Sequence, residues 1–300
     1  MKKNDNVQKN NNIHDNFFKS LFSVKENLAD LLHGSLPQDV LQGLKIESLE
    51  YDPTEYVDQE LAPYFKDISC NMLYGETNIK ISLLYEHKSY PDKNIHLQLL
   101  RYILNVWENQ VANKQKLTPV ITMVFYHGKR KWTESGFVHV PEQLKRYVPL
   151  FDYALFDTKD IEDHAIIRHF KRPSVKVAVW FMKRSDDLIG FIQNNPDLAR
   201  EMFSQLKGID ETIFQKIALY LYKVSDLEAE KINEIMETIS PQTKDAFEEI
   251  RNELERSGFN KGVEQTAINM VKKGYADAQI AEITGLGIEQ IQKLKKENRH

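Results

Sequence analysis

The spacing of hydrophobic residues predicts an α/β arrangement in the first half of the chain. Helical spacing places Phe17, Phe18 and Leu21 on one face of a first helix. The sequence Ser23-Val-Lys-Glu26 has the pattern of a capping box that opens a second helix. A third helix is expected at 92–109, with Leu97, Leu100, Leu104 and Trp107 facing inward. Alternating or continuous apolar runs predict strands at 46–51, 67–74, 79–85, 119–126 and 153–157.

Beyond about residue 160 the pattern becomes mostly helical. Helices are expected at 175–182, 187–193, 213–222, 241–255, 267–273, 277–284 and 288–296. Ser257-Gly258 is expected to interrupt the helical stretch that starts at Pro241. We therefore predict a mixed sheet flanked by helices, followed by an α-helical C-terminal extension. The expected segments are a disordered tail (1–12), an α/β domain (13–160), a helical region (161–256) and a small helical segment (257–300).

Composition narrows the class of protein. Of the 300 residues, 41% are hydrophobic and 28% charged, which is typical of a globular protein. Cys70 is the only cysteine, which rules out an internal disulfide and favours a reducing cytoplasm. No apolar run is long enough to cross a membrane. The nine histidines show no HExxH spacing, and the net charge of -4 argues against a large surface that coats DNA.

Two acids and a lysine are predicted to meet at one edge of the sheet. Asp67 and Glu86 lie at the outer ends of one predicted hairpin, so they are expected to be neighbours. Glu86 and Lys88 are two residues apart and point to the same face, whereas His87 points away. Two carboxylates can hold Mg²⁺, and a lysine can stabilise charge on a phosphate under attack. The alternative is a salt-bridged strand end, because this spacing alone is a weak pattern.

The following helix carries a second pair of polar residues. Gln98 and Tyr102 are four residues apart and therefore share one helical face. Polar groups there are able to reach back towards a metal or a DNA phosphate, so we group both residues with the predicted site.

Four segments together resemble a known family. They are His14-Asp15-Asn-Phe-Phe-Lys19, Tyr85-Glu-His-Lys-Ser89, Gln98-Leu-Leu-Arg-Tyr102 and Pro119 to Gly128. In this order they are similar to the PD-(D/E)xK nuclease superfamily, and more narrowly to the recombination-promoting nuclease and putative transposase family (YhgA-like) of bacteria. The resemblance covers about residues 14 to 160. Many relatives have Gln in place of Lys88, and Lys66 stands where the superfamily often has proline.

The resemblance implies a Mg²⁺-dependent DNA endonuclease linked to recombination or to defence against foreign DNA. Asp67 and Glu86 would be the metal ligands and Lys88 the catalytic lysine. Gln98 and Tyr102 match a Gln-x-x-x-Tyr helix motif found in several branches of the superfamily. The expected partner is DNA, and a homo-oligomer is left open. No membrane and no organic cofactor are expected.

Three further residues are candidates for DNA contacts near this site. His14 and Asp15 precede the first predicted helix, and His127 follows a buried strand. Asp15 is equally well explained as a helix N-cap, and His127 as a structural histidine at a strand end. Glu26 is better explained by the capping box than as an extra acid facing the metal.

The C-terminal segment resembles a helix-turn-helix. Gln279 to Ile291 contains a turn with two glycines, and Ile280, Ile283, Leu286, Ile288, Ile291 and Leu294 are expected to form its core. The final helix carries Lys293, Lys295 and Lys296, which are candidates for phosphate contacts. A helical hairpin for packing or dimerisation explains the pattern equally well.

Overall fold

A computed structural model describes residues 13–51, 68–86, 92–133, 141–149, 151–225, 229–240 and 244–297. The chain divides into two compact units, residues 1–228 and 229–300. This division is coarser than the four segments expected from the sequence, which stay a prediction. None of the described helices combines the length and the apolarity needed to span a bilayer.

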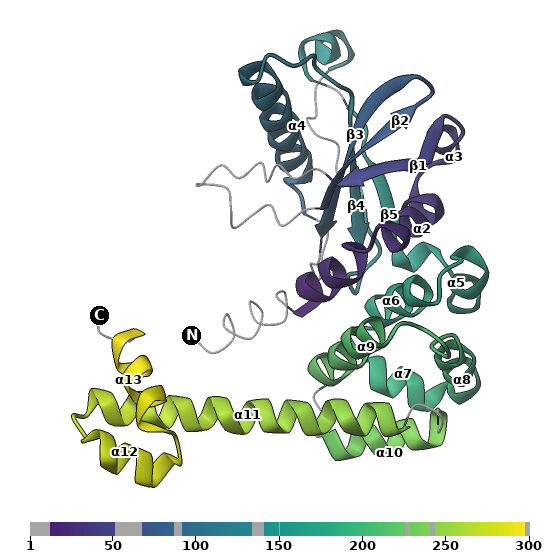
Figure 1. The fold of residues 1–300 in the computed structure, drawn as a ribbon. Helices are drawn as coiled ribbons and strands as arrows, with labels where there is room; N and C mark the ends of the chain where they lie inside the picture. The colour runs from purple at the N-terminus through teal and green to yellow at the C-terminus, as the bar shows by residue number, and fades with distance from the viewer. Residues whose placement is uncertain are drawn as a thin grey trace. The chain divides into compact units, whose positions relative to one another are not determined.

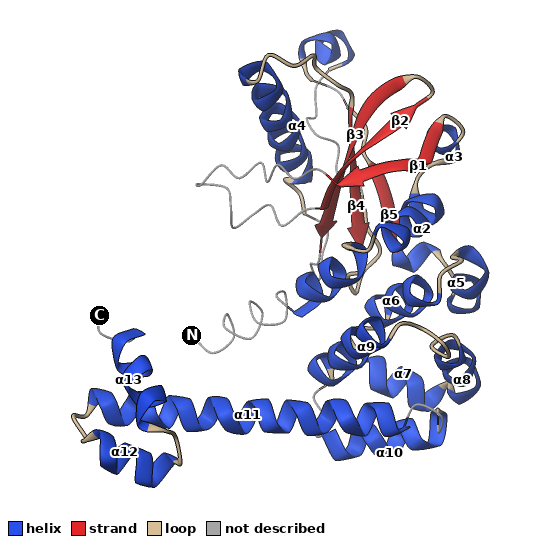
Figure 2. Ribbon diagram, in the orientation of Figure 1, coloured by secondary structure: helices blue, strands red, loops and turns tan. Residues whose placement is uncertain are grey.

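The first unit is built on one five-stranded mixed sheet in the order β1-β2-β3-β4-β5 (Figure 2). The strands are β1 (Leu44–Tyr51), β2 (Ile68–Tyr74), β3 (Thr77–Glu86), β4 (Val120–Tyr126) and β5 (Ala154–Asp157). β1, β2 and β3 run antiparallel, whereas β4 and β5 run parallel to β3. Gly75 and Glu76 form the two-residue turn between β2 and β3, and Gly75 has a φ of 56°. All five predicted strands are confirmed to within a few residues.

Helices cover both faces of the sheet, as the alternation of side chains along β4 shows. Val124 and Tyr126 pack against Ile95 and Leu99 of α4 (Ile95–Ala112). On the opposite face, the ring of Phe125 lies 5.3 Å from that of Phe18 in helix 13–22. The continuous apolar run of β4 therefore reflects burial on both faces, as predicted.

Two details at the N-terminal helices differ from the prediction. The second helix, α2 (Lys25–Ser35), has Val24 at its N-cap and no side-chain cap, so the capping box of Ser23 and Glu26 is wrong. The Ser23 hydroxyl donates instead to the carbonyl of Ser20. Asp15 lies within helix 13–22 and so is not an N-cap. A short helix, α3 (Gln38–Leu41), follows α2.

The inward face predicted for α4 is also wrong. Its buried residues are Ile95, Leu99, Tyr102, Ile103, Val106 and Gln110. Leu97 and Leu104 are exposed, and Leu100 and Trp107 are only half-buried. The helix carries two adjacent apolar stripes, and periodicity cannot tell which one the sheet covers.

A helical lobe follows β5 (Figure 1). Its α-helices are α5 (Asp163–His169), α6 (Pro173–Lys183), α7 (Leu188–Asn194), α8 (Pro196–Ser204) and α9 (Glu211–Val224). Two 3-10 helices precede it, η1 (Glu142–Tyr147) and η2 (Thr158–Asp160). The core is centred on Trp180, which is fully buried against Phe181, Phe191 and Phe203.

Polar contacts bind this lobe to α2. The Asp30 carboxylate accepts hydrogen bonds from the backbone N–H groups of Lys171 and Arg172, the shortest being 2.8 Å. The Asn27 side-chain oxygen accepts from Arg172 Nε and from the Ser174 hydroxyl. These acceptors satisfy the N-cap amide of α6, at Arg172, and neighbouring backbone and side-chain donors. The sheet and the lobe are therefore joined within one unit.

The second unit contains α10 (Ala229–Ile239), α11 (Lys244–Lys272), α12 (Asp277–Thr284) and α13 (Ile288–Glu297). The break expected at Ser257-Gly258 is wrong, because α11 runs through both residues. Glycine in a helix interior costs only about 1 kcal/mol, which a long helix can absorb.

Candidate functional site

The carboxyl ends of three parallel strands form the candidate site. Glu86 is the last residue of β3 and pairs with Tyr126 of β4, which pairs in turn with Asp157 of β5. His127 follows Tyr126 directly. Ligands commonly bind beyond the carboxyl ends of strands in open α/β sheets. The structure thus confirms that Glu86 is at a strand end. The buried polar residues His127 and Asp157 are at the ends of the two neighbouring strands.

Asp67, His87 and Lys88 lie outside the described residues, as does the side chain of Glu86. The nearest described residue to Asp67 is Ile68, which pairs with Leu83, three positions before Glu86. β2 therefore starts at the end of the sheet where β3 finishes. Within the described ranges, no three histidine, cysteine, aspartate or glutamate side chains gather closely enough to hold a metal. The predicted metal ligands stay a prediction.

Gln98 and Tyr102 lie one turn apart on α4. Gln98 is half-buried, and its Nε2 donates to the Asp92 carboxylate at 3.0 Å. The other Asp92 oxygen accepts from the backbone N–H of Asn94, so Asp92 organises the start of the helix. Tyr102 is buried, with 6% of its surface exposed. The pair shares one face as predicted, although its role in catalysis stays untested.

The two histidines predicted for DNA contacts meet in the interior. The rings of His14 and His127 are 5.2 Å apart, and the residues are 5% and 3% exposed. Nδ1 of His14 lies 2.7 Å from the Tyr220 hydroxyl, with which it forms a hydrogen bond. Nδ1 of His127 lies 3.1 Å from the Met182 carbonyl and 3.3 Å from the Ser185 hydroxyl. Both rings are therefore in the interior of the first unit and not on its surface.

Burial also sets the charge states of His14 and Tyr220. Burial lowers the pKa of the His14 imidazole from 6.5 to about 4, so the ring is neutral at pH 7. Burial raises the pKa of the Tyr220 hydroxyl well above its usual value, although a hydrogen bond from Ser185 opposes the shift. The His14 imidazole and the Tyr220 hydroxyl are therefore both neutral, and they are hydrogen-bonded to each other.

Two other buried charges near the strand ends have structural roles. The Asp157 carboxylate accepts from the backbone N–H groups of Trp132 and Lys159, at 2.7 Å and 2.9 Å. Lys183 donates to the carbonyls of Thr158 and Ile161. Burial lowers the pKa of Lys183, and the nearby Asp163 carboxylate partly reverses that shift. Both side chains hold the loop after β5 in place.

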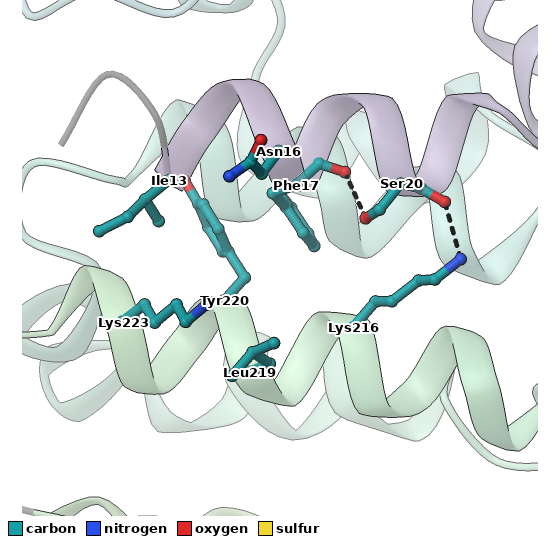
Figure 3. Close-up of a pocket in the computed structure, with 8 residues that line it drawn as sticks. All are labelled: Ile13, Asn16, Phe17, Ser20, Lys216, Leu219, Tyr220 and Lys223. Carbon is teal, nitrogen blue, oxygen red and sulfur yellow. Dashed lines mark hydrogen bonds between the residues drawn. The ribbon is translucent and has the colours of Figure 1, made fainter. Parts of the chain in front are cut away.

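A groove lies between helix 13–22 and α9 (Figure 3). It has a volume of about 640 Å³ and an apolar floor that includes Phe17, Leu219 and Tyr220. Its other lining residues include Asn16 and two lysines. Lys216 donates to the Ser20 carbonyl at 3.0 Å, and Lys223 is exposed. Tyr220 thus lines the groove and also contacts His14.

The sequence did not reveal Tyr220 or Ser185 as neighbours of the two histidines. His14 and Tyr220 are separated by 206 positions, and His127 and Ser185 by 58. No local pattern links residues so far apart. The packing of α9 against helix 13–22 brings Tyr220 to His14, and the contact of the end of α6 with His127 brings Ser185 to that ring.

The end of the second unit consists of two short helices joined by a three-residue turn. That this is a DNA-binding helix-turn-helix stays a prediction. α12 and α13 are joined by Gly285-Leu286-Gly287, and Gly285 adopts a φ of 72°. Ala267 and Met270 of α11 share a core with Ile280 and Ile291, against which Leu286 and Leu294 also pack. Ile283 and Ile288, which we expected in this core, are 63% and 51% exposed, so that part of the prediction is wrong.

The three C-terminal lysines differ in their surroundings. Lys293 and Lys296 are exposed on α13. Lys295 forms an ion pair with Asp277 at the start of α12, and both side chains are about 30% exposed. Lys295 therefore holds the two helices together, whereas Lys293 and Lys296 keep exposed surface.

Comparison with known proteins decides the family. Residues 12–210 match the family described as putative transposase, YhgA-like. The chain belongs to this family. The match covers the sheet and most of the helical lobe, so the YhgA-like part of the chain lies within the first compact unit. No solved structure matches the chain.

Curated relatives of this YhgA-like chain differ in their stated activity. The inactive recombination-promoting nuclease-like protein RpnE of Escherichia coli (strain K12) is 24% identical over 277 residues, covering 87% of this chain and 90% of the relative. The recombination-promoting nuclease RpnD of Escherichia coli O157:H7 is 27% identical over 188 residues, covering 60% and 71%. The nuclease RpnC of strain K12 is 22% identical, covering 68% and 70%. The names support a nuclease role in broad terms.

Proposed function

We propose that this YhgA-like chain is a cytoplasmic, Mg²⁺-dependent DNA endonuclease. The observation that carries the proposal is the position of Glu86 at the carboxyl end of β3, beside β4 and β5. Asp67 and Glu86 supply carboxylate oxygens, which are the ligands that Mg²⁺ prefers. The bound metal would lower the pKa of a water molecule and neutralise charge on the phosphate.

The reaction is hydrolysis of a phosphodiester bond. A water oxygen bonds to phosphorus, the bond from phosphorus to one ester oxygen breaks, and the departing sugar oxygen takes up a proton. Lys88 supplies a positive charge that stabilises the extra negative charge of the transition state. Gln98 and Tyr102 of α4 are the further polar groups that the proposal assigns to the site. His14 is buried and neutral, and its ring lies 5.2 Å from that of His127, which follows β4 directly.

Cleavage of supercoiled plasmid tests the proposal. The wild-type protein with Mg²⁺ should convert supercoiled plasmid to nicked or linear forms, and EDTA should stop the reaction. Lys88→Ala should lower the rate about 100-fold or more, because it removes a group that stabilises transition-state charge. Asp67→Ala should abolish activity.

The matched control is Lys93→Ala, which removes an exposed lysine five positions after Lys88. This variant should cleave like the wild type. If Asp67→Ala and Lys88→Ala also cleave like the wild type, the endonuclease proposal is wrong.

A second candidate function is a non-catalytic DNA-binding or regulatory protein that retains the fold. Two observations favour it: the short turn that joins α12 and α13 above a shared core, and the relative RpnE, which is named as inactive. Binding of DNA without cleavage in the plasmid assay would support this function over the first.

A further inference from the structure

One face of α4 carries an apolar stripe that the sheet does not cover. Leu97, Leu104 and Val111 are 48%, 44% and 64% exposed. Leu100 and Trp107 lie between them and are half-buried. The five residues alternate at intervals of three and four positions, so they form one continuous line along the helix.

This stripe is separate from the face that packs on the sheet. The sheet-facing side is formed by Ile95, Leu99, Ile103 and Val106, which are buried. α4 stands beside the sheet, apart from the helical lobe (Figure 1). Three large apolar side chains in one exposed row are more than the scattered exposed leucines of an ordinary surface.

The spacing is that of a coiled-coil seam. In a heptad repeat the a and d positions alternate by three and four residues. With Leu97, Leu104 and Val111 as a positions, Leu100 and Trp107 become d positions. At about 1.5 Å per residue the seam is roughly 21 Å long. A seam of this kind is completed by a second helix with the same spacing.

The charges beside the seam indicate that the second helix is α4 of another copy. Arg101 and Glu108 occupy the same heptad position, e, on the exposed side of the seam. In an antiparallel pair the two e positions face each other, so Arg101 meets Glu108 of the partner subunit, and the pairing occurs twice. A parallel pair would need g positions as partners, but Ile103 and Gln110 at g are buried.

We propose that α4 forms an antiparallel pair with α4 of a second copy of this chain, through the seam from Leu97 to Val111. A single pair of helices with a seam of this length buries less surface than a standard protein interface, which buries about 800 Å² on each partner. The dimer should therefore form at micromolar or higher concentration.

Sedimentation velocity of the full chain between about 1 and 100 µM tests the proposal. The wild type should shift from monomer to dimer over this range. Leu104→Glu places a charge in the seam at an exposed position, so the fold should persist and the dimer should disappear. Circular dichroism confirms that the variant is folded.

Ile283→Glu is the matched control, because it makes the same kind of change at an exposed residue of the second unit. This variant should dimerise like the wild type. Loss of the dimer in Ile283→Glu but not in Leu104→Glu would place the interface in the second unit and overturn the proposal. A wild type that stays monomeric up to about 100 µM would overturn it too.

Charge reversal tests the antiparallel orientation. Arg101→Glu should weaken the dimer about tenfold, because two ion pairs in each dimer become repulsive. The double variant Arg101→Glu/Glu108→Arg restores both ion pairs and should recover most of the affinity. If the double variant is as weak as the single one, this pairing is wrong.

Discussion

At the residue scale, the contact between His14 and Tyr220 shows how burial selects a charge state. His14 is 5% exposed and lies 2.7 Å from a phenol that burial also keeps neutral. A histidine on the surface would titrate near pH 6.5, whereas burial lowers the pKa of this one to about 4. His14 and Tyr220 are thus two neutral polar groups that are hydrogen-bonded to each other in the interior.

This shift predicts a pH dependence of stability. Between pH 6.5 and 4 the unfolded chain protonates His14 and the folded chain does not, so folding should lose stability as the pH falls. The full contribution is present above pH 6.5, and the loss by pH 4 should be roughly 3 kcal/mol. His14→Gln removes the titration and keeps a polar side chain. Urea unfolding at several pH values should show a flatter dependence for the variant, and parallel curves would contradict the assignment.

At the element scale, the strands followed their sequence patterns closely. β4 was predictable because its run is apolar on both faces, and β2 and β3 because Gly75-Glu76 marks a two-residue turn. The buried face of α4 was not predictable, because two apolar stripes compete for it. The inward stripe is decided by the neighbours Val124, Tyr126 and Trp132, which the local sequence does not contain.

The candidate site was predictable to a smaller extent. Glu86 could be placed at a strand end because an apolar strand precedes it. Its proximity to His127 depends on parallel pairing of β3 with β4, which requires the crossover through α4. The contacts of His14 depend on α9, about 200 positions later. Hydrophobic periodicity carries no information about such distant pairs.

Glycine substitutions in the second unit test how its turn is built. An added Cβ meets no atom within 4 Å at Gly285 or at Gly262, so steric clashes are excluded at both. Gly285 has a φ of 72°, and Gly285→Ala should destabilise the unit by about 1 kcal/mol. Gly262 lies inside α11, and Gly262→Ala should stabilise it by about 1 kcal/mol. Thermal unfolding should give melting shifts of opposite sign. If Gly285→Ala raised the melting temperature as Gly262→Ala does, the positive φ at Gly285 would not be a requirement of the turn.

At the scale of the whole molecule, the two candidate functions rest on different compact units of the chain. The family match ends at residue 210, within the first unit, and the predicted helix-turn-helix, α12 and α13, belongs to the second. Under the endonuclease proposal the first unit would act on DNA, whereas under the second candidate function the second unit would bind it.

The exposed lysines of α13 separate these contributions. Lys293→Glu/Lys296→Glu should weaken binding of duplex DNA without Mg²⁺, and the slope of log K against log salt should fall by about one for each phosphate that the protein no longer neutralises. Lys207→Glu, at an exposed position of the first unit, is the control. Fluorescence anisotropy between about 50 and 200 mM salt measures both quantities. Equal binding by the wild type and the double variant would exclude α13 from the DNA interface.

The contact between His14 and Tyr220 also has a consequence during synthesis. The apolar side of helix 13–22, including Phe17, is completed by α9, whose Tyr220 ring stacks on that of Phe17 at 3.8 Å. A ribosome adds about 5 to 20 residues per second, so the 206 positions between these partners take on the order of 10 to 40 s. For that interval the nascent chain carries an aromatic helix face that its own later segment has not yet covered. Chaperones that bind exposed apolar helices would therefore find a binding site at helix 13–22 during this interval.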